Sequence, residues 1–105
     1  MKIVFIGTVE FSKKAFEKLL EMDSDIIGVC TKKDSKFNSD YSDLTPLCRH
    51  AGIPYKVIED INSEDSISWI RSLSPDIIFC FGWSSLIKRE LLILPPMGIL
   101  GYHPA

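Results

Sequence analysis

The feature that most constrains the fold of this chain is a regular alternation of short apolar runs with amphipathic segments. The first run, residues 2–7, is rich in β-branched side chains and stops at Gly7. Such a run is typical of a strand buried on both faces of a parallel sheet. Four more strands are expected on the same grounds, over residues 25–31, 54–58, 76–81 and 97–102.

Segments with helical periodicity lie between these strands. Apolar residues recur at helical spacing between Phe11 and Leu20, with charged residues among them. This pattern predicts a helix over about residues 9–22 with Thr8 as its N-cap. Ser63 is placed to cap a further helix that Pro75 ends. Two short helices are also expected, over residues 43–50 and 86–92.

The order of these elements predicts the fold class. Strands and helices that alternate with short connections form right-handed β-α-β crossovers. The expected fold is therefore α/β, a Rossmann-like open parallel sheet of about five strands with helices on both faces. Residues 1–105 show no internal repeat or domain boundary, and the polar stretch over residues 32–41 is expected to be an exposed, mobile loop.

The composition disfavours several classes of partner. Twelve basic and fourteen acidic side chains give a net charge of −2, and no cluster of Lys and Arg is longer than a pair. The segment therefore has no strong footprint for nucleic acid or for a membrane surface. No signal peptide or membrane span is recognisable. The three cysteines lack C-x-x-C spacing, which suits a reducing cytosol, so a cytoplasmic location is expected.

Dinucleotide and metal sites are also disfavoured. The first turn between strand and helix contains a single glycine, Gly7, and places Val9 and Phe11 where a dinucleotide site needs close backbone approach. A phosphate-binding P-loop is absent as well. Cys48 and His50 are two residues apart and lack further ligands, so no metal site is expected there.

The turn after the fourth predicted strand is a candidate binding element, because ligands of open parallel sheets bind beyond the carboxyl ends of the strands. Trp83 in this turn can wall a pocket for a flat heterocycle, and Ser84 and Ser85 can donate hydrogen bonds. The alternative is a plain entry into a helix, in which Ser84 or Ser85 is the N-cap and Trp83 packs in the core.

His103 follows the last predicted strand and is the candidate catalytic residue. A histidine at this place can act as a general acid or base near neutral pH, or can stabilise a developing oxyanion. The alternative is a structural histidine in a turn before Pro104. The catalytic interpretation requires the turn after Phe81 and the end of the strand at Tyr102 to meet at one pocket.

Both ends of the chain resemble the formyltransferase family. The opening stretch MKIVFIGTVEFSKKAFEKLL is similar to the start of methionyl-tRNA formyltransferases, and PDIIFCFGWSSLIKRELLILPPMGILGYHPA resembles a later segment of that family. The resemblance covers nearly the whole chain in element order but is specific only in the first twenty and last thirty residues. It implies that residues 1–105 are the amino-terminal part of a formyltransferase catalytic domain, truncated at the His-Pro-Ala sequence.

The resemblance also implies a reaction and a site. The family transfers a formyl group from 10-formyltetrahydrofolate to a primary amine, here that of a sugar nucleotide or of methionyl-tRNA. The charge balance and the His-Pro-Ala turn lean toward the sugar nucleotide, and a homo-oligomer is compatible with the sequence. The formyl group would lie near His103. The residues expected to bind the folate donor are Phe81, Gly82, Trp83, Ser84 and Leu86.

Two departures from the family pattern bear on activity. Gly101 stands where the family has an asparagine whose amide donates to the formyl oxygen, and loss of such a donor costs about 2.7–4 kcal/mol. The family's Leu-Leu-Pro loop and later aspartate are absent from these 105 residues. The chain alone is therefore expected to be inactive. Two alternatives stay open: a non-catalytic binding module on the same scaffold and a nucleotide-binding Rossmann domain.

Overall fold

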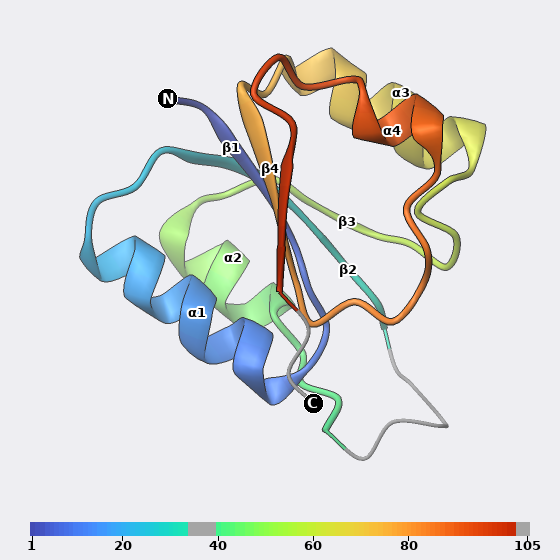
Figure 1. Cartoon of the computed structure of the whole chain (residues 1–105). Coiled ribbons are helices and arrows are strands. Elements are labelled where there is room, and N and C mark those ends of the chain that lie inside the picture. Colours follow the sequence, from blue (N-terminus) through green and yellow to red (C-terminus); the bar gives the residue numbers. More distant parts are fainter. Residues whose placement is uncertain (34–39, 103–105) are drawn as a thin grey trace.

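Strands and helices alternate along the chain in the predicted order (Figure 1). The structure is a computed structural model that describes residues 1–33 and 40–102. Its elements are β1 (Ile3–Ile6), α1 (Glu10–Glu21), β2 (Ile26–Thr31), α2 (Thr45–Ala51), β3 (Tyr55–Val57), α3 (Glu64–Leu73), β4 (Ile77–Phe81), α4 (Arg89–Leu92) and β5 (Ile99–Tyr102). Part of the predicted loop over residues 32–41 lies outside the described residues.

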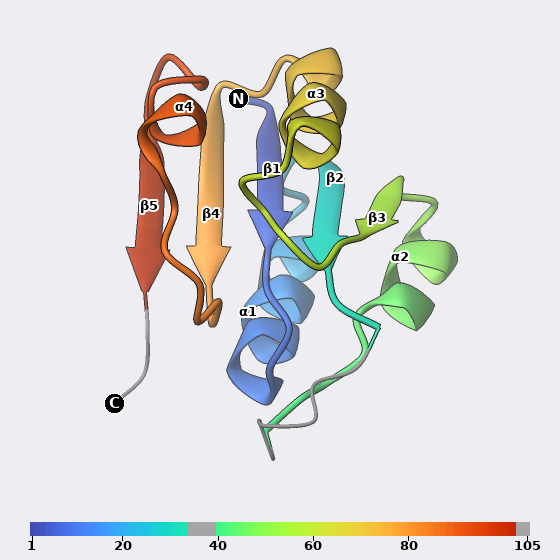
Figure 2. The same cartoon turned by 90° about the vertical axis from the view of Figure 1, so that its right-hand side faces the viewer.

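The five strands form one parallel sheet in the order β3-β2-β1-β4-β5. Figure 2 shows their arrowheads pointing the same way. The chain builds outward from β1 to β3, then crosses back to place β4 on the other side of β1. The strand order thus reverses between β1 and β4, which is where open α/β sheets bind ligands. The predicted α/β class and Rossmann-like arrangement are confirmed.

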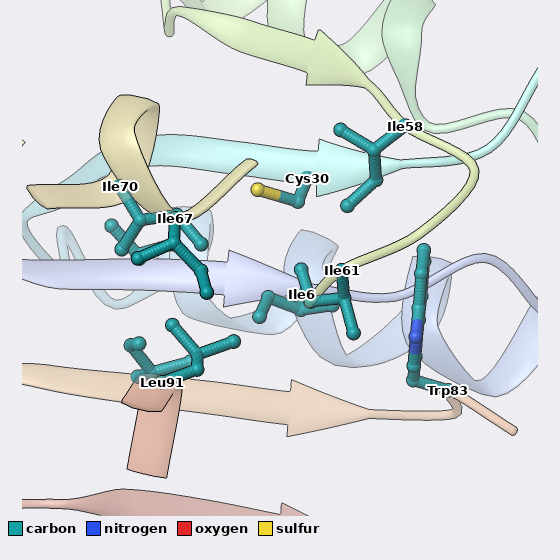
Figure 3. Packing of buried hydrophobic residues seen from close by; sticks show 10 residues of the cluster. Ile6, Cys30, Ile58, Ile61, Ile67, Ile70, Trp83 and Leu91 are labelled. Atoms are coloured by element: carbon teal, nitrogen blue, oxygen red, sulfur yellow. The ribbon is translucent and has the colours of Figure 1, made fainter. Parts of the chain in front are cut away.

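Helices cover both faces of the sheet, with α1 and α2 on one face and α3 and α4 on the other (Figure 1). Residues along β1 alternate between two cores, as the strand period of two requires. Phe5 points to the first face, where its ring stacks on Phe16 of α1 with centroids 5.4 Å apart. Val4 and Ile6 belong to the second core, together with Ile67 and other buried residues (Figure 3).

Three helices have ends that differ from the predictions: α1, α4, and α2, which spans Thr45–Ala51 rather than residues 43–50. The N-cap of α1 is Val9, not Thr8, because the hydroxyl that accepts the free backbone N–H groups belongs to Ser12 inside the first turn. Ser63 caps α3 as predicted and accepts a hydrogen bond from the backbone N–H of Ser66 at 3.1 Å.

The last helix is shorter than predicted. It starts at Arg89 rather than at residue 86, with Lys88 as its N-cap. The Asn62 side chain explains this start, since it donates to the Leu86 carbonyl oxygen at 2.7 Å and accepts from the Lys88 N–H at 2.8 Å. These bonds hold the connecting segment in a non-helical path. In the described part of the chain, every helix is too short or too polar to cross a membrane.

Candidate functional site

The carboxyl ends of β4 and β5 lie side by side at one end of the sheet (Figure 2). Phe81 and Tyr102 are partners in the strand register. The Gly82 N–H continues this pairing past the end of β4 by donating to the Tyr102 carbonyl oxygen at 3.0 Å. The structure therefore brings the turn after Phe81 next to the end of β5. His103, the predicted catalytic residue, lies outside the described residues.

The turn after β4 depends on glycine at position 82. Gly82 has a φ of +77°, a left-handed conformation that other residues adopt only with strain. A Cβ atom there would lie 2.5 Å from Cγ2 of Val9 and would overlap Oγ of Ser12. Both the backbone conformation and the close approach of the β1–α1 turn therefore require a residue without a side chain.

Ser12 connects the β1–α1 turn to the end of β4. Its side chain is fully buried, and its Oγ accepts hydrogen bonds from the backbone N–H groups of Thr8 and Val9, both at 3.2 Å. The same hydroxyl donates to the Phe81 carbonyl oxygen at 2.5 Å. The sequence reasoning missed this residue; its signal was a small polar side chain in the first turn of a helix, three residues after the N-cap.

Trp83 is only 5% exposed and belongs to the second core, which α3 and α4 cover. It packs at one end of that core. Figure 3 shows its ring extending from the end of β4 toward Ile58. Its indole Nε1 has no hydrogen-bond partner among the described residues, and the Lys32 ammonium lies 5.0 Å from its ring centroid. The Trp83 ring therefore packs in the core, as the alternative interpretation expected. Its role as the wall of a ligand pocket stays a prediction.

The remaining residues of the turn face solvent. Ser84 and Ser85 are exposed, and neither caps a helix, because α4 begins only at Arg89. Leu86 is exposed as well, and its carbonyl oxygen is bound by Asn62. The structure thus presents the hydroxyl groups of the two serines at the end of the sheet, where they are free to contact a ligand.

An aromatic surface lies beside this turn on the α1 side of the sheet. Phe81 is half-buried, with its ring centroid 6.2 Å from that of Phe11. Tyr102 is 56% exposed, and its ring centroid lies 4.9 Å from that of Phe11. The sequence analysis did not predict this group, because its rings come from three segments that only the sheet order brings together.

A separate open hollow of about 480 Å³ lies at the opposite end of the sheet and contains none of the predicted site residues. Its lining residues come from the end of α3 and the turn before β4, and from α4 and the turn that follows it. They are Arg71, Ser74, Pro75, Asp76, Glu90, Ile93, Leu94 and Pro96.

The cysteines are poor nucleophiles in this fold. Burial raises the pKa of the Cys30 thiol to about 12 and that of Cys80 to about 11. Burial, followed by the nearby Asp43 carboxylate, raises the pKa of Cys48 to about 11. All three thiols are therefore protonated at neutral pH, and the thiolate is the reactive form.

The chain is similar in sequence to curated formyltransferases over its whole length. It is 32% identical to the methionyl-tRNA formyltransferase of Kosmotoga olearia, covering 98% of this chain and 34% of that protein. The Geotalea uraniireducens protein of the same name is 31% identical, over 98% of this chain and 34% of that protein. The methionyl-tRNA formyltransferase of Thermotoga sp. is 28% identical, over 100% of this chain and 35% of that protein. The chain thus spans about a third of the length of these relatives. No family model matches it.

A solved structure supports the fold. Glycinamide ribonucleotide transformylase 1 from Symbiobacterium toebii superimposes with a TM-score of 0.69, covering 96% of this chain and 50% of that one. The two sequences are 12% identical over this match, so the likeness concerns the arrangement of strands and helices.

Proposed function

We propose that this chain is the amino-terminal part of a formyltransferase, as its similarity to methionyl-tRNA formyltransferases suggests, and that it forms the donor-binding part of a formyl-transfer site. The reaction moves a formyl group from 10-formyltetrahydrofolate to a primary amine. The observation that carries the proposal is the meeting of the β4 and β5 ends, joined by the Gly82 N–H and the Tyr102 carbonyl oxygen.

Such a site must bind the folate donor, stabilise the oxyanion that forms during the reaction, and move a proton. The amine attacks the formyl carbon, a C–N bond forms and the carbonyl oxygen gains negative charge in a tetrahedral intermediate. The amine then loses a proton, and the bond from the formyl carbon to the folate nitrogen breaks as that nitrogen takes up a proton. In our proposal His103 moves the proton or stabilises the oxyanion. The donor is held by Phe81, Gly82, Trp83, Ser84 and Leu86.

Four of the five proposed donor residues differ in how far they are exposed. Ser84 and Leu86 are exposed at the end of the sheet and are free to contact the folate directly. Gly82 and Trp83 are enclosed, one against Ser12 and the other within the core. We therefore propose that the enclosed pair shapes the turn and that the exposed residues touch the donor.

The acceptor amine is proposed to be that of methionyl-tRNA. The curated relatives described above carry methionyl-tRNA formyltransferase as their name, and this outweighs the weak lean of the charge balance toward a sugar nucleotide. No run of Lys and Arg in the sequence is longer than a pair, so we propose that the main tRNA contacts come from outside this segment. A cytoplasmic location fits both this acceptor and the unpaired cysteines.

A non-catalytic binding module is the second candidate, and Gly101 is the observation that favours it. Glycine lacks the amide donor that the family places at this position, so the formyl oxygen would lose one hydrogen bond. The backbone at Gly101 nevertheless accepts a side chain: an added Cβ would lie 3.8 Å from the Cys80 carbonyl oxygen, an ordinary contact distance. The position can therefore be used to test the site.

The test is Gly101→Asn, measured as binding of 10-formyltetrahydrofolate by titration calorimetry. A new hydrogen bond contributes about 0.5–1.5 kcal/mol net, so we expect the asparagine variant to bind the donor several-fold more tightly than the unaltered chain. Gly101→Ala is the matched control, because it adds the Cβ atom without a donor. Equal affinities for the asparagine and alanine variants would contradict the proposed site.

A further inference from the structure

The peptide group between Phe81 and Gly82 is hydrogen-bonded on both sides. Its carbonyl oxygen accepts from Oγ of Ser12 at 2.5 Å. Its N–H donates to the Tyr102 carbonyl oxygen at 3.0 Å. One peptide unit at the end of β4 is thereby attached to the first turn of α1 on one side and to the end of β5 on the other.

The Ser12 hydroxyl is fully used by these contacts. A serine hydroxyl has one donor and two acceptor positions. Here the backbone N–H groups of Thr8 and Val9 occupy the acceptor positions. The single hydroxyl hydrogen is therefore left to donate to the Phe81 carbonyl oxygen. Ser12 thus connects the β1–α1 turn to the end of β4 through a hydrogen bond that it donates.

Two glycines allow the turns to approach Ser12 this closely. A Cβ on Gly7 would lie 2.5 Å from Cβ of Ser12 and 2.6 Å from the Phe81 carbonyl oxygen. A Cβ on Gly82 would overlap Oγ of Ser12. The serine hydroxyl thus fills a narrow space between the β1–α1 turn and the β4 turn, at the point where the strand order reverses.

We propose that Ser12 is a positioning residue for the donor-binding turn. This inference rests on the proposed function, since it assumes that the turn from Phe81 to Leu86 contacts the folate. Ser12 itself is fully buried and acts through the Phe81–Gly82 peptide, which determines the direction in which the chain leaves β4. Without the hydroxyl, the Phe81 carbonyl oxygen loses this partner and the turn is free to shift.

Ser66 provides a matched control for a purely local role. It occupies the same third position of its helix as Ser12, is 2% exposed, and donates to the Asp60 carbonyl oxygen at 2.8 Å. Its partners are three and six residues away in the sequence, whereas Ser12 and Phe81 are 69 residues apart. Loss of either hydroxyl should destabilise its helix start, but only Ser12 links two distant turns.

The experiment compares Ser12→Ala with Ser66→Ala in a Trp69→Phe background. The chain has two tryptophans, so Trp83, which directly follows Gly82, becomes the only indole that emits. Both serine variants should lower the urea midpoint. Only Ser12→Ala should shift the Trp83 emission to longer wavelength, increase its quenching by acrylamide, and weaken binding of 10-formyltetrahydrofolate by up to about tenfold, the equivalent of one lost hydrogen bond.

The outcomes separate this inference from the proposed function. If Ser12→Ala alters the Trp83 emission but the unaltered chain binds no folate, the positioning of the turn is upheld and the proposed function fails. If the emission and quenching of Ser12→Ala match those of Ser66→Ala, the positioning role is overturned.

Hydrogen exchange of the unaltered chain provides a test that does not depend on the folding of a variant. The amide hydrogens of Thr8 and Val9 should exchange as slowly as that of Gly82, because all three belong to the same connection. Fast exchange at Thr8 and Val9 beside a protected Gly82 would also overturn the positioning role.

Discussion

Replacing Gly82 by alanine tests the close contact between the β1–α1 turn and the turn after β4. Two costs add in this variant. A φ of +77° is unfavourable for alanine by roughly 1–2 kcal/mol. The new methyl group would also meet Ser12 and Val9, and overpacking of this kind costs about 1–3 kcal/mol. The expected loss in the free energy of unfolding is therefore about 2–5 kcal/mol.

Urea denaturation followed by circular dichroism measures this loss. With a urea m-value of about 2 kcal/mol per molar, the middle of the usual range for small proteins, the midpoint should fall by roughly 1–2.5 M. A loss this large is a substantial share of the total stability of a small domain, about 5–15 kcal/mol. The circular dichroism spectrum without urea shows whether the variant is still folded before the midpoints are compared.

Gly98→Ala and Gly52→Ala are the matched controls. Their φ values are +80° and +70°, close to that of Gly82, but an added Cβ at either position meets no atom within 4 Å. They should therefore show the backbone cost alone, about 1–2 kcal/mol. If Gly82→Ala were no less stable than Gly98→Ala, the contact with Ser12 would not restrict this turn, and the reasoning that links the two turns would be refuted.

Three further predictions concern the core, the thiols and the candidate catalytic residue. Leu91→Ala should cost about 2–5 kcal/mol in chemical unfolding because Leu91 is 0% exposed, whereas Leu92→Ala, at a residue 46% exposed, should cost much less; equal losses would contradict the packing of α4. The pKa of Cys30 is raised from 9.0 to about 12, so the folded state keeps this proton longer than the unfolded state. Its contribution to stability is complete below about pH 9 and is lost as the pH rises toward 12. The urea midpoint should fall across this range more steeply than in Cys30→Ala, and parallel curves would show that the thiol is not protected. If the proposed formyl transfer is observed, His103→Ala should lower its rate by about 10²-fold or more, and an unchanged rate would assign His103 a structural role.

Local pattern was enough to predict most of the fold. The apolar run ending at Gly7, the periodicity from Phe11 to Leu20 and the Ser63 cap depend on neighbours within a few residues, and each has the predicted structure. The alternation of elements then determined the parallel sheet through the handedness of β-α-β crossovers. The meeting of the β4 and β5 ends followed from that topology.

Features that depend on distant residues could not be predicted from the sequence. The start of α4 is set by the Asn62 side chain, which is 26 residues away from Lys88. The link from Ser12 to Phe81 spans 69 residues. The aromatic surface of Phe11, Phe81 and Tyr102 likewise combines three segments. Periodicity carries no information on such contacts, because they arise only after the sheet has assembled.

The strand order has a consequence for how the chain is made on the ribosome. β1 lies in the centre of the sheet between β2 and β4, yet about 45 residues separate the end of β2 from the start of β4. Translation at about 5–20 residues per second delays β4 by several seconds. During this interval one edge of the apolar strand Ile3–Ile6 has no partner in the nascent chain, and such an edge invites aggregation. Chaperones that bind extended apolar peptides should therefore protect this protein most while residues 32–76 are being synthesised.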